Sequence, residues 1–349
     1  MYHVKPLVTQ KALLIGLILI CCNFLYVNNL QSQDIHYSQF YNPVLVVNPG
    51  KTGIFNGDKR LNLSYRDQWS SVPVPWRTFT GSYDQKFYPK KSDKYFFSGG
   101  LSFNYDRQGD SEISLSNINL LGSWTKVLNE NNLITIGLNL GYATRGFDLT
   151  NLQWDSQWNG SQFDPALPSG ELFDAERINF FENALGLNYR WQKDRRTKFD
   201  IGVSAYHVIE PGVAFFSNDD IKLPRRYNLS AILSKQLSSR FDLQVQGLGQ
   251  LQNEYYEILG SGLIKIHINN KRGKEAELHV GIGYRTSGSL FVPILALELK
   301  ERYYFSMNFE RDLSDFSIAT ENNAGFEAHF RYIITNVKPL KTFKTCPIY

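Results

Sequence analysis

Cysteine is scarce in this sequence, with only three residues among 349. Long apolar runs are equally scarce, because the strongest candidate, Ala12 to Val27, is shorter than the roughly 20 residues that a membrane-spanning helix needs. The net charge is only +4, which gives no reason to expect a nucleic-acid partner. Together these shortages exclude a disulfide-built scaffold, a bundle of membrane helices and a strongly basic nucleic-acid-binding protein.

The N-terminus has the features of an export signal. Lys5 and Lys11 precede the apolar run, and Ser32 supplies the small residue that signal peptidase requires. We therefore predict that residues 1–32 are a signal peptide. The alternatives are a retained membrane anchor or a lipid anchor on the paired cysteines within the run. Cleavage would leave Cys346 alone, which excludes an intramolecular disulfide and a cysteine-built metal site.

Catalytic motifs are also missing. The sequence contains no G-x-S-x-G, no H-E-x-x-H and no glycine-rich phosphate loop between a strand and a helix. The histidines after the signal, at 36, 207, 267, 279 and 329, are scattered without ligand spacing. We therefore predict that the protein is not an enzyme, with no catalytic, cofactor-binding or metal site.

What the sequence does contain is aromatic residues (14%) and period-two alternation. In residues 134–143 every second residue is Ile, Leu or Tyr, and those between are small or polar, which in a strand places them on opposite faces. An apolar outer face and a polar inner face are typical of an outer-membrane barrel. The pattern predicts an all-β fold, a transmembrane antiparallel β-barrel of about 14 strands over residues 59–334. Strands are expected near 60–69, 77–87, 95–106, 114–127, 132–147, 179–191, 198–209, 225–237, 241–252, 256–268, 276–286, 291–300, 302–311 and 324–334.

The connections between these strands alternate in length. Short polar turns alternate with longer loops, of which 148–178 is the longest. Such barrels keep short turns in the periplasm, so we predict both termini there, with 148–178 outside the cell. Residues 33–58 become an N-terminal periplasmic segment and residues 335–349 a periplasmic C-terminal tail. A secreted β-sandwich or propeller is the alternative, but its apolar outer face would aggregate in water.

Charged residues of both signs fall on the predicted inner face. Because neither sign dominates, we expect cross-barrel networks that narrow the interior, and a charge-selective pore is the alternative. The long loop carries Trp154 and Trp158, which could form a docking surface or fold inward. The inner-face charges are Arg190, Asp200, Asp242, Lys265, Arg285, Glu298, Glu310, Glu327 and Arg331.

Several short motifs follow the signal in a fixed order. The first reads Tyr37-Ser-Gln-Phe-Tyr-Asn-Pro43, a second Asn-Pro follows at 48–49, and Tyr65-Arg66-Asp-Gln-Trp69 lies in the first strand. In this order they resemble the PorP/SprF family of Bacteroidota outer-membrane proteins, as does the tryptophan-containing loop. The candidate partner-contact or family-motif residues are Gln39, Phe40, Asn42, Pro43, Asn48, Pro49, Tyr65, Arg66, Gln68, Trp69, Trp154 and Trp158.

The resemblance implies a role in type IX secretion and gliding motility. Its members sit in the cell outer membrane, associate with periplasmic and outer-membrane secretion components, and support the export or surface attachment of a large adhesin. The expected partners are therefore outer-membrane lipid, those components and the C-terminal domain of a secreted adhesin. The alternative is an outer-membrane channel or transporter for small or hydrophobic solutes, because other fourteen-stranded barrels transport apolar molecules.

Overall fold

The computed structural model describes residues 34–335, apart from 71, 73–74, 90–93, 110, 149–151, 153, 171–174, 217–220, 272 and 316. The chain divides into residues 1–33 and 34–349, and the second unit contains all of the described residues. The predicted signal peptide and residues 336–349 of the predicted tail lie outside the described residues.

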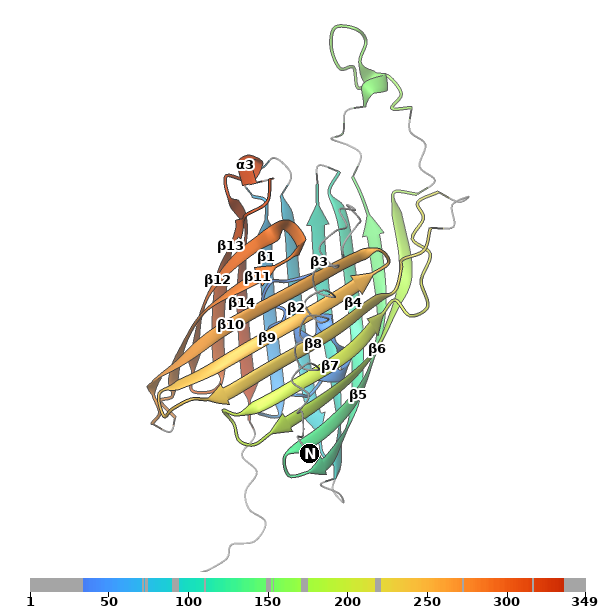
Figure 1. The fold of residues 1–349 in the computed structure, drawn as a ribbon. Coiled ribbons are helices and arrows are strands. Elements are labelled where there is room, and N and C mark those ends of the chain that lie inside the picture. Colours follow the sequence, from blue (N-terminus) through green and yellow to red (C-terminus); the bar gives the residue numbers. More distant parts are fainter. Residues whose placement is uncertain are drawn as a thin grey trace, which may run out of the picture. The chain divides into compact units, whose positions relative to one another are not determined.

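The second unit is a closed antiparallel β-barrel (Figure 1). Within the described residues it has fourteen strands, each paired with the next along the chain, and Lys59 of the first strand faces Ile334 of the last. The predicted fold is thus confirmed. The strands are β1 (Lys59–Gln68), β2 (Trp76–Phe87), β3 (Tyr95–Gln108), β4 (Ile113–Asn129), β5 (Asn132–Gly146), β6 (Arg177–Gln192), β7 (Lys198–Tyr206), β8 (Arg226–Gln236), β9 (Phe241–Gln252), β10 (Tyr255–Asn269), β11 (Ala276–Arg285), β12 (Leu290–Leu299), β13 (Tyr303–Asp312) and β14 (Asn323–Ile334).

Alternation of side chains explains why these segments form a membrane barrel. On β5, Leu138 is 44% exposed on the outer face, whereas its neighbour Asn139 is only 3% exposed and faces inward. The outer residues can meet lipid, and the closed hydrogen-bond ladder leaves no unpaired sheet edge at membrane depth. One sector departs from the expected polar interior, because Leu259, Leu263 and Ile294 of β10 and β12 point inward and are buried.

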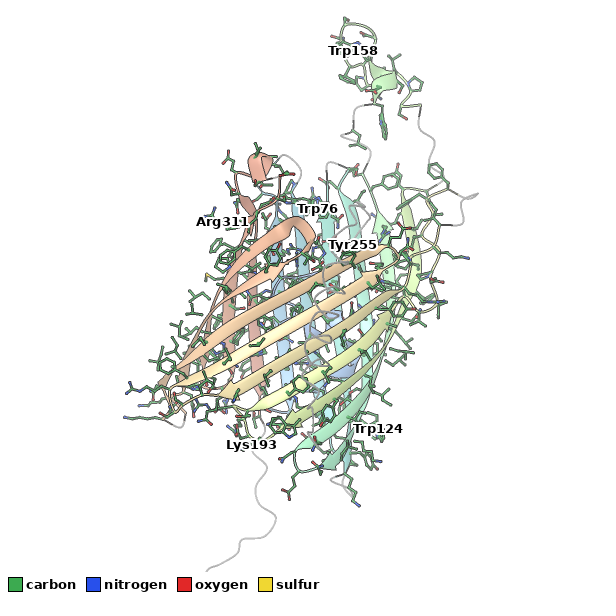
Figure 2. The ribbon with its side chains drawn as sticks, in the orientation of Figure 1. Trp76, Trp124, Trp158, Lys193, Tyr255 and Arg311 are labelled. Carbon is green, nitrogen blue, oxygen red and sulfur yellow. The ribbon has the colours of Figure 1, made fainter. Side chains whose placement is uncertain are left out.

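The two ends of the barrel differ. The three longest connections, 147–176, 207–225 and 313–322, lie at one end, which we call the loop end and which is uppermost in Figure 1. The other end, where β1 begins, is the turn end. A tryptophan lies near each end of the barrel, Trp76 at the loop end and Trp124 at the turn end (Figure 2). Membrane barrels carry aromatic girdles at these two positions, where the bilayer meets water.

Short helices occur only outside the strands in the described part of the chain. None of these helices has the length and hydropathy to cross a membrane. They are α2 (Val44–Val47), η1 (Pro49–Lys51), η2 (Asp155–Gln157), η3 (Ser287–Ser289) and α3 (Ser317–Thr320).

Residues 34–55 do not extend from the barrel as a periplasmic segment, which corrects that part of the prediction for residues 33–58. Every residue from 34 to 55 is buried or half-buried, and its hydrogen bonds reach side chains on opposite walls, such as Glu327 of β14 and Ser204 of β7. A segment that touches opposite walls of a closed barrel lies in its lumen. This position is favourable because the backbone and side-chain amide groups of the segment form hydrogen bonds with the wall, and its apolar side chains are removed from water. We call residues 34–55 the plug.

Candidate functional site

The plug runs along the lumen from near the loop end to the turn end. At its start, Asp34 pairs with Arg226 (3.0 Å) and with His207 (2.9 Å), where β8 begins and β7 ends. At its other end, the backbone N–H of Asp58 donates to the carbonyl of Ile334 (2.9 Å), and β1 begins at the next residue. The plug is therefore connected directly to the first strand and occupies the interior that a channel would need.

A buried group of charges fixes the first half of the plug. The Arg66 guanidinium lies 2.8 Å from a Glu310 carboxylate oxygen and 3.3 Å from one of Glu327. The backbone N–H groups of Ser38 and Gln39 donate to the two oxygens of Glu327, at 2.6 and 2.9 Å. The wall adds His329, whose Nε2 lies 3.3 Å from Glu327, and the plug N–H groups add charge-assisted hydrogen bonds to the same carboxylate. The plug is therefore part of a buried charge group that belongs mainly to the wall.

The arginine also holds the plug directly. Its Nη1 donates to the backbone carbonyl of His36 at 3.1 Å, and the hydroxyl of Tyr37 donates to Thr80 at 3.0 Å. Nearby, the side-chain amide of Asn42 donates to Ser306 of β13 at 3.0 Å. Because these partners lie on β1, β2 and β13, the plug contacts several strands on one side of the barrel at once.

Glycines let the plug come close to the opposite wall. The side-chain amide of Asn48 donates to the backbone carbonyls of Leu187 on β6 (3.1 Å) and Val203 on β7 (3.3 Å). At this point the plug backbone lies close to the backbone of the wall. A Cβ at Gly186 would lie 2.0 Å from Asn48 Oδ1, and one at Gly137 would lie 2.2 Å from the Pro49 carbonyl oxygen. Only glycine allows this approach. We call Gly137, Gly186 and Gly202 the glycine seam.

Apolar packing anchors the middle of the plug. Phe40, Tyr41 and Val47 are at most 7% exposed and pack in one cluster with the inward leucines of β9 and β10. Full burial of such a side chain contributes about 1.5–3 kcal/mol. The apolar sector of the lumen is therefore the docking surface of the plug's apolar residues.

The structure separates the family-motif residues into two groups. Gln39, Phe40, Asn42, Pro43, Asn48 and Pro49 belong to the plug, and Arg66 and Gln68 face it from β1. The other four lie elsewhere. Tyr65 is 37% exposed on the outer face, Trp69 packs on Trp76 (4.7 Å between ring centroids), and Trp158 packs on Phe163 (5.3 Å), near Trp154 in the sequence.

Motif analysis missed several residues that complete this site. Glu310 and Glu327 appeared only as members of a charged inner face. That face forms ion pairs between neighbouring strands, including Arg190 with Asp200 (2.7 Å) and Arg285 with Glu257 (3.0 Å). The glycine seam was also missed. Its signal was available in the sequence, because inward glycines on adjacent strands leave space that something must fill.

One group could offer ligands to a metal ion. Glu277, His279 and Glu298 place three ligand atoms within 4.8 Å of one another. Both carboxylates already have partners in the wall, since Glu277 lies 3.2 Å from the His267 ring and Glu298 lies 3.4 Å from the Arg331 guanidinium. The arrangement is better explained as part of the lumenal charge network than as a metal centre.

Comparisons with known proteins identify the family of the chain. The sequence profile of the type IX secretion system membrane protein PorP/SprF matches residues 29–332. No curated protein matches the sequence. Among solved structures, the Ralstonia pickettii toluene transporter TbuX is 9% identical, with a TM-score of 0.49 over 83% of this chain and 92% of that one. A Pseudomonas aeruginosa FadL homologue is 11% identical, with a TM-score of 0.47 over 81% and 91%. The chain is an outer-membrane β-barrel that belongs to the PorP/SprF family of type IX secretion system membrane proteins.

Proposed function

We propose that this barrel is an accessory of the type IX secretion system that supports the export or surface attachment of a large adhesin. The observation that carries the proposal is that the chain's own plug lies in the lumen along much of its length and is held there by family-motif residues such as Asn42, Asn48 and Arg66. With the plug in place, the ends and the outer surface of the barrel are the surfaces that a protein partner can contact. We also propose that it has no catalytic role.

Its partners would meet the barrel at both ends. Periplasmic secretion components would bind the turn end, and the C-terminal domain of the adhesin would bind the loop end. The loop between β5 and β6 supports the second contact, because Trp158 and Phe163 are 50% and 40% exposed there. Exposed aromatic side chains dominate the energetics of many protein interfaces.

Deletion of the gene tests this proposal. We expect one large protein to disappear from the cell surface, with loss of gliding if that protein is the gliding adhesin, while small-solute uptake is unchanged. Quantitative mass spectrometry of shaved surface proteins and uptake assays give the two readouts. Complementation with Trp154→Ala/Trp158→Ala should restore the barrel but not surface display, and Ser161→Ala in the same loop should restore both.

The opposite outcome would support the transport alternative. An unchanged surface proteome together with lost uptake of a small or hydrophobic solute would contradict the secretion role. It would also require the plug to move, since residues 34–55 lie in the path of any solute that crosses the lumen.

A further inference from the structure

A cavity of about 760 Å³ lies between the plug and the turn end of the lumen. Residues of the plug, including Lys51 and Phe55, form its inner side, and turn residues such as Arg196 and Lys300 line its mouth. The cavity therefore opens towards the aqueous phase at the turn end. We call it the basal chamber.

The charge of the basal chamber is strongly unbalanced. Ten Lys and Arg residues line it, against six Asp and Glu. This excess of four equals the net charge of the whole 349-residue chain. A concave site lined by an excess of one sign focuses its field and concentrates ligands of the opposite sign. The chamber is thus electrostatically suited to an anion.

The carboxylates that line the chamber already have partners, so they do not take the place of such an anion. Asp200 is paired with Arg190 (2.7 Å) and Asp242 with Arg196 (2.6 Å). Two further carboxylates pair with arginines, Glu298 with Arg331 and Glu301 with Arg195. Glu277 lies beside the His267 ring, and the Glu275 carboxylate accepts a hydrogen bond from the Gly273 N–H. Arg60 is in turn paired with Asp84 (2.7 Å), which does not line the chamber. The carboxylates near the lysines, such as Asp200 and Glu298, are thus shared with an arginine, and the chamber keeps an excess of positive charge.

Three of the lysines that line the chamber are buried or half-buried, Lys51, Lys198 and Lys265. The ammonium groups of Lys51, Lys198 and Lys265 make no hydrogen bond and no ion pair within 4 Å to any residue that the structure describes. Lys51 is only 5% exposed. Lys198 is close enough to Lys265 and to Arg190 to be repelled by both. Positive charges that lie close together in a half-buried site repel one another, and a bound anion reduces this unfavourable energy.

We propose that the basal chamber binds the carboxylate side chains of an acidic peptide segment of a periplasmic partner. The volume is within the range of ligand sites and far exceeds that of one inorganic ion. Ile54, Phe55 and Ile232 also line the chamber, so aliphatic parts of a peptide would find apolar contacts. The following segment of this chain has the wrong sign, because it carries Lys338, Lys341 and Lys344. This proposal does not depend on the secretion role.

The test uses the full mature chain, folded in uncharged detergent, with fluorescein-labelled hexaglutamate and hexalysine as anisotropy probes. We expect saturable binding of hexaglutamate, no binding of hexalysine, and affinity at least tenfold weaker in Lys198→Gln/Lys265→Gln. The control Lys126→Gln/Lys235→Gln removes two exposed lysines outside the chamber and should leave the affinity unchanged. Lys198→Arg/Lys265→Arg keeps the charge and should retain binding, which separates charge from folding.

Three results would overturn the proposal. The first is equal hexaglutamate affinity in the chamber variant and the control variant. The second is complete displacement of hexaglutamate by inorganic phosphate but not by chloride at equal ionic strength, which would indicate a small-oxyanion site. The third is binding only after truncation at Thr335, which would assign the chamber to the chain's own following segment.

Discussion

Arg66 and Glu310 are 244 residues apart in the sequence, yet their side chains form an ion pair of 2.8 Å with at most 2% exposure. The pair joins β1 to β13 beneath the plug, which adds the N–H groups of Ser38 and Gln39 to the same charge group through Glu327. The family's arginine motif is therefore part of the mechanism that fixes the plug.

Loss of this arginine should release the plug. Arg66→Ala leaves Glu310 and Glu327 buried without their cation, which costs about 3–5 kcal/mol. We expect amide hydrogen exchange in residues 34–42 to accelerate by about two orders of magnitude or more, since 1.4 kcal/mol is tenfold. The control is Arg77→Ala on β2, whose 3.7 Å pair with Asp67 is 57% exposed on the arginine side and contributes about 0–1 kcal/mol. Equal exchange in both variants would contradict the role of Arg66.

A side chain on the glycine seam should displace the plug from the wall. In Gly186→Ala the new Cβ would lie 2.0 Å from Asn48 Oδ1 and 2.7 Å from the Gly50 nitrogen. We expect a higher single-channel conductance in planar bilayers than for the wild type. Gly122→Ala on β4 is the matched control, because a Cβ there meets nothing within 4 Å. If both variants conduct like the wild type, the plug does not depend on close contact at the seam.

Neighbouring positions on β9 test which face meets lipid. Val245 is 46% exposed on the outer face, and Gln244 lines the basal chamber. Val245→Arg places a charge in lipid at a cost of about 2–4 kcal/mol near the midplane, whereas Gln244→Arg adds one to a hydrated space. We expect only the first to lower the fraction of heat-modifiable, folded barrel on gels. Equal losses would show that the two faces are assigned wrongly.

The direction of the barrel in the membrane remains a prediction from connection lengths. Ser161→Cys in the long loop should react with an impermeant maleimide on intact cells, and Asn131→Cys in the β4–β5 turn should react only after the outer membrane is opened. Both residues are exposed on the protein surface, so the labelling depends on which side of the outer membrane each one lies. The reverse pattern would place the turn end outside and the basal chamber at the cell surface.

Sequence patterns predicted the barrel well because lipid imposes one rule on every strand. Outward residues such as Leu138 must be apolar, and that requirement repeats every second residue over most of the chain. The number of strands and their approximate limits follow from this repetition. The closure of β1 on β14 follows from the need to leave no open edge in a bilayer.

The plug was not predicted because its residues obey no period. Its contacts are non-local, and residues such as Asn48 bond to backbone carbonyls that any sequence would supply. Two signals were nevertheless present. The segment from Phe291 to Leu297 is apolar on both faces, which calls for an apolar partner inside the barrel. Ile35, Phe40 and Val44 are apolar side chains that a periplasmic segment would leave in water.

Thiol accessibility of the plug tests the central claim most directly. Ser38 is 2% exposed, so Ser38→Cys in a mature chain that also carries Cys346→Ser should be inert to maleimide–polyethylene glycol until the barrel is heat-denatured. Lys193→Cys, in the exposed β6–β7 turn at the turn end (Figure 2), is the reference and should react at once. Protection of position 38 in the folded barrel is the result that a lumenal plug predicts. Labelling of both positions at the same rate would show instead that residues 34–55 extend into the periplasm.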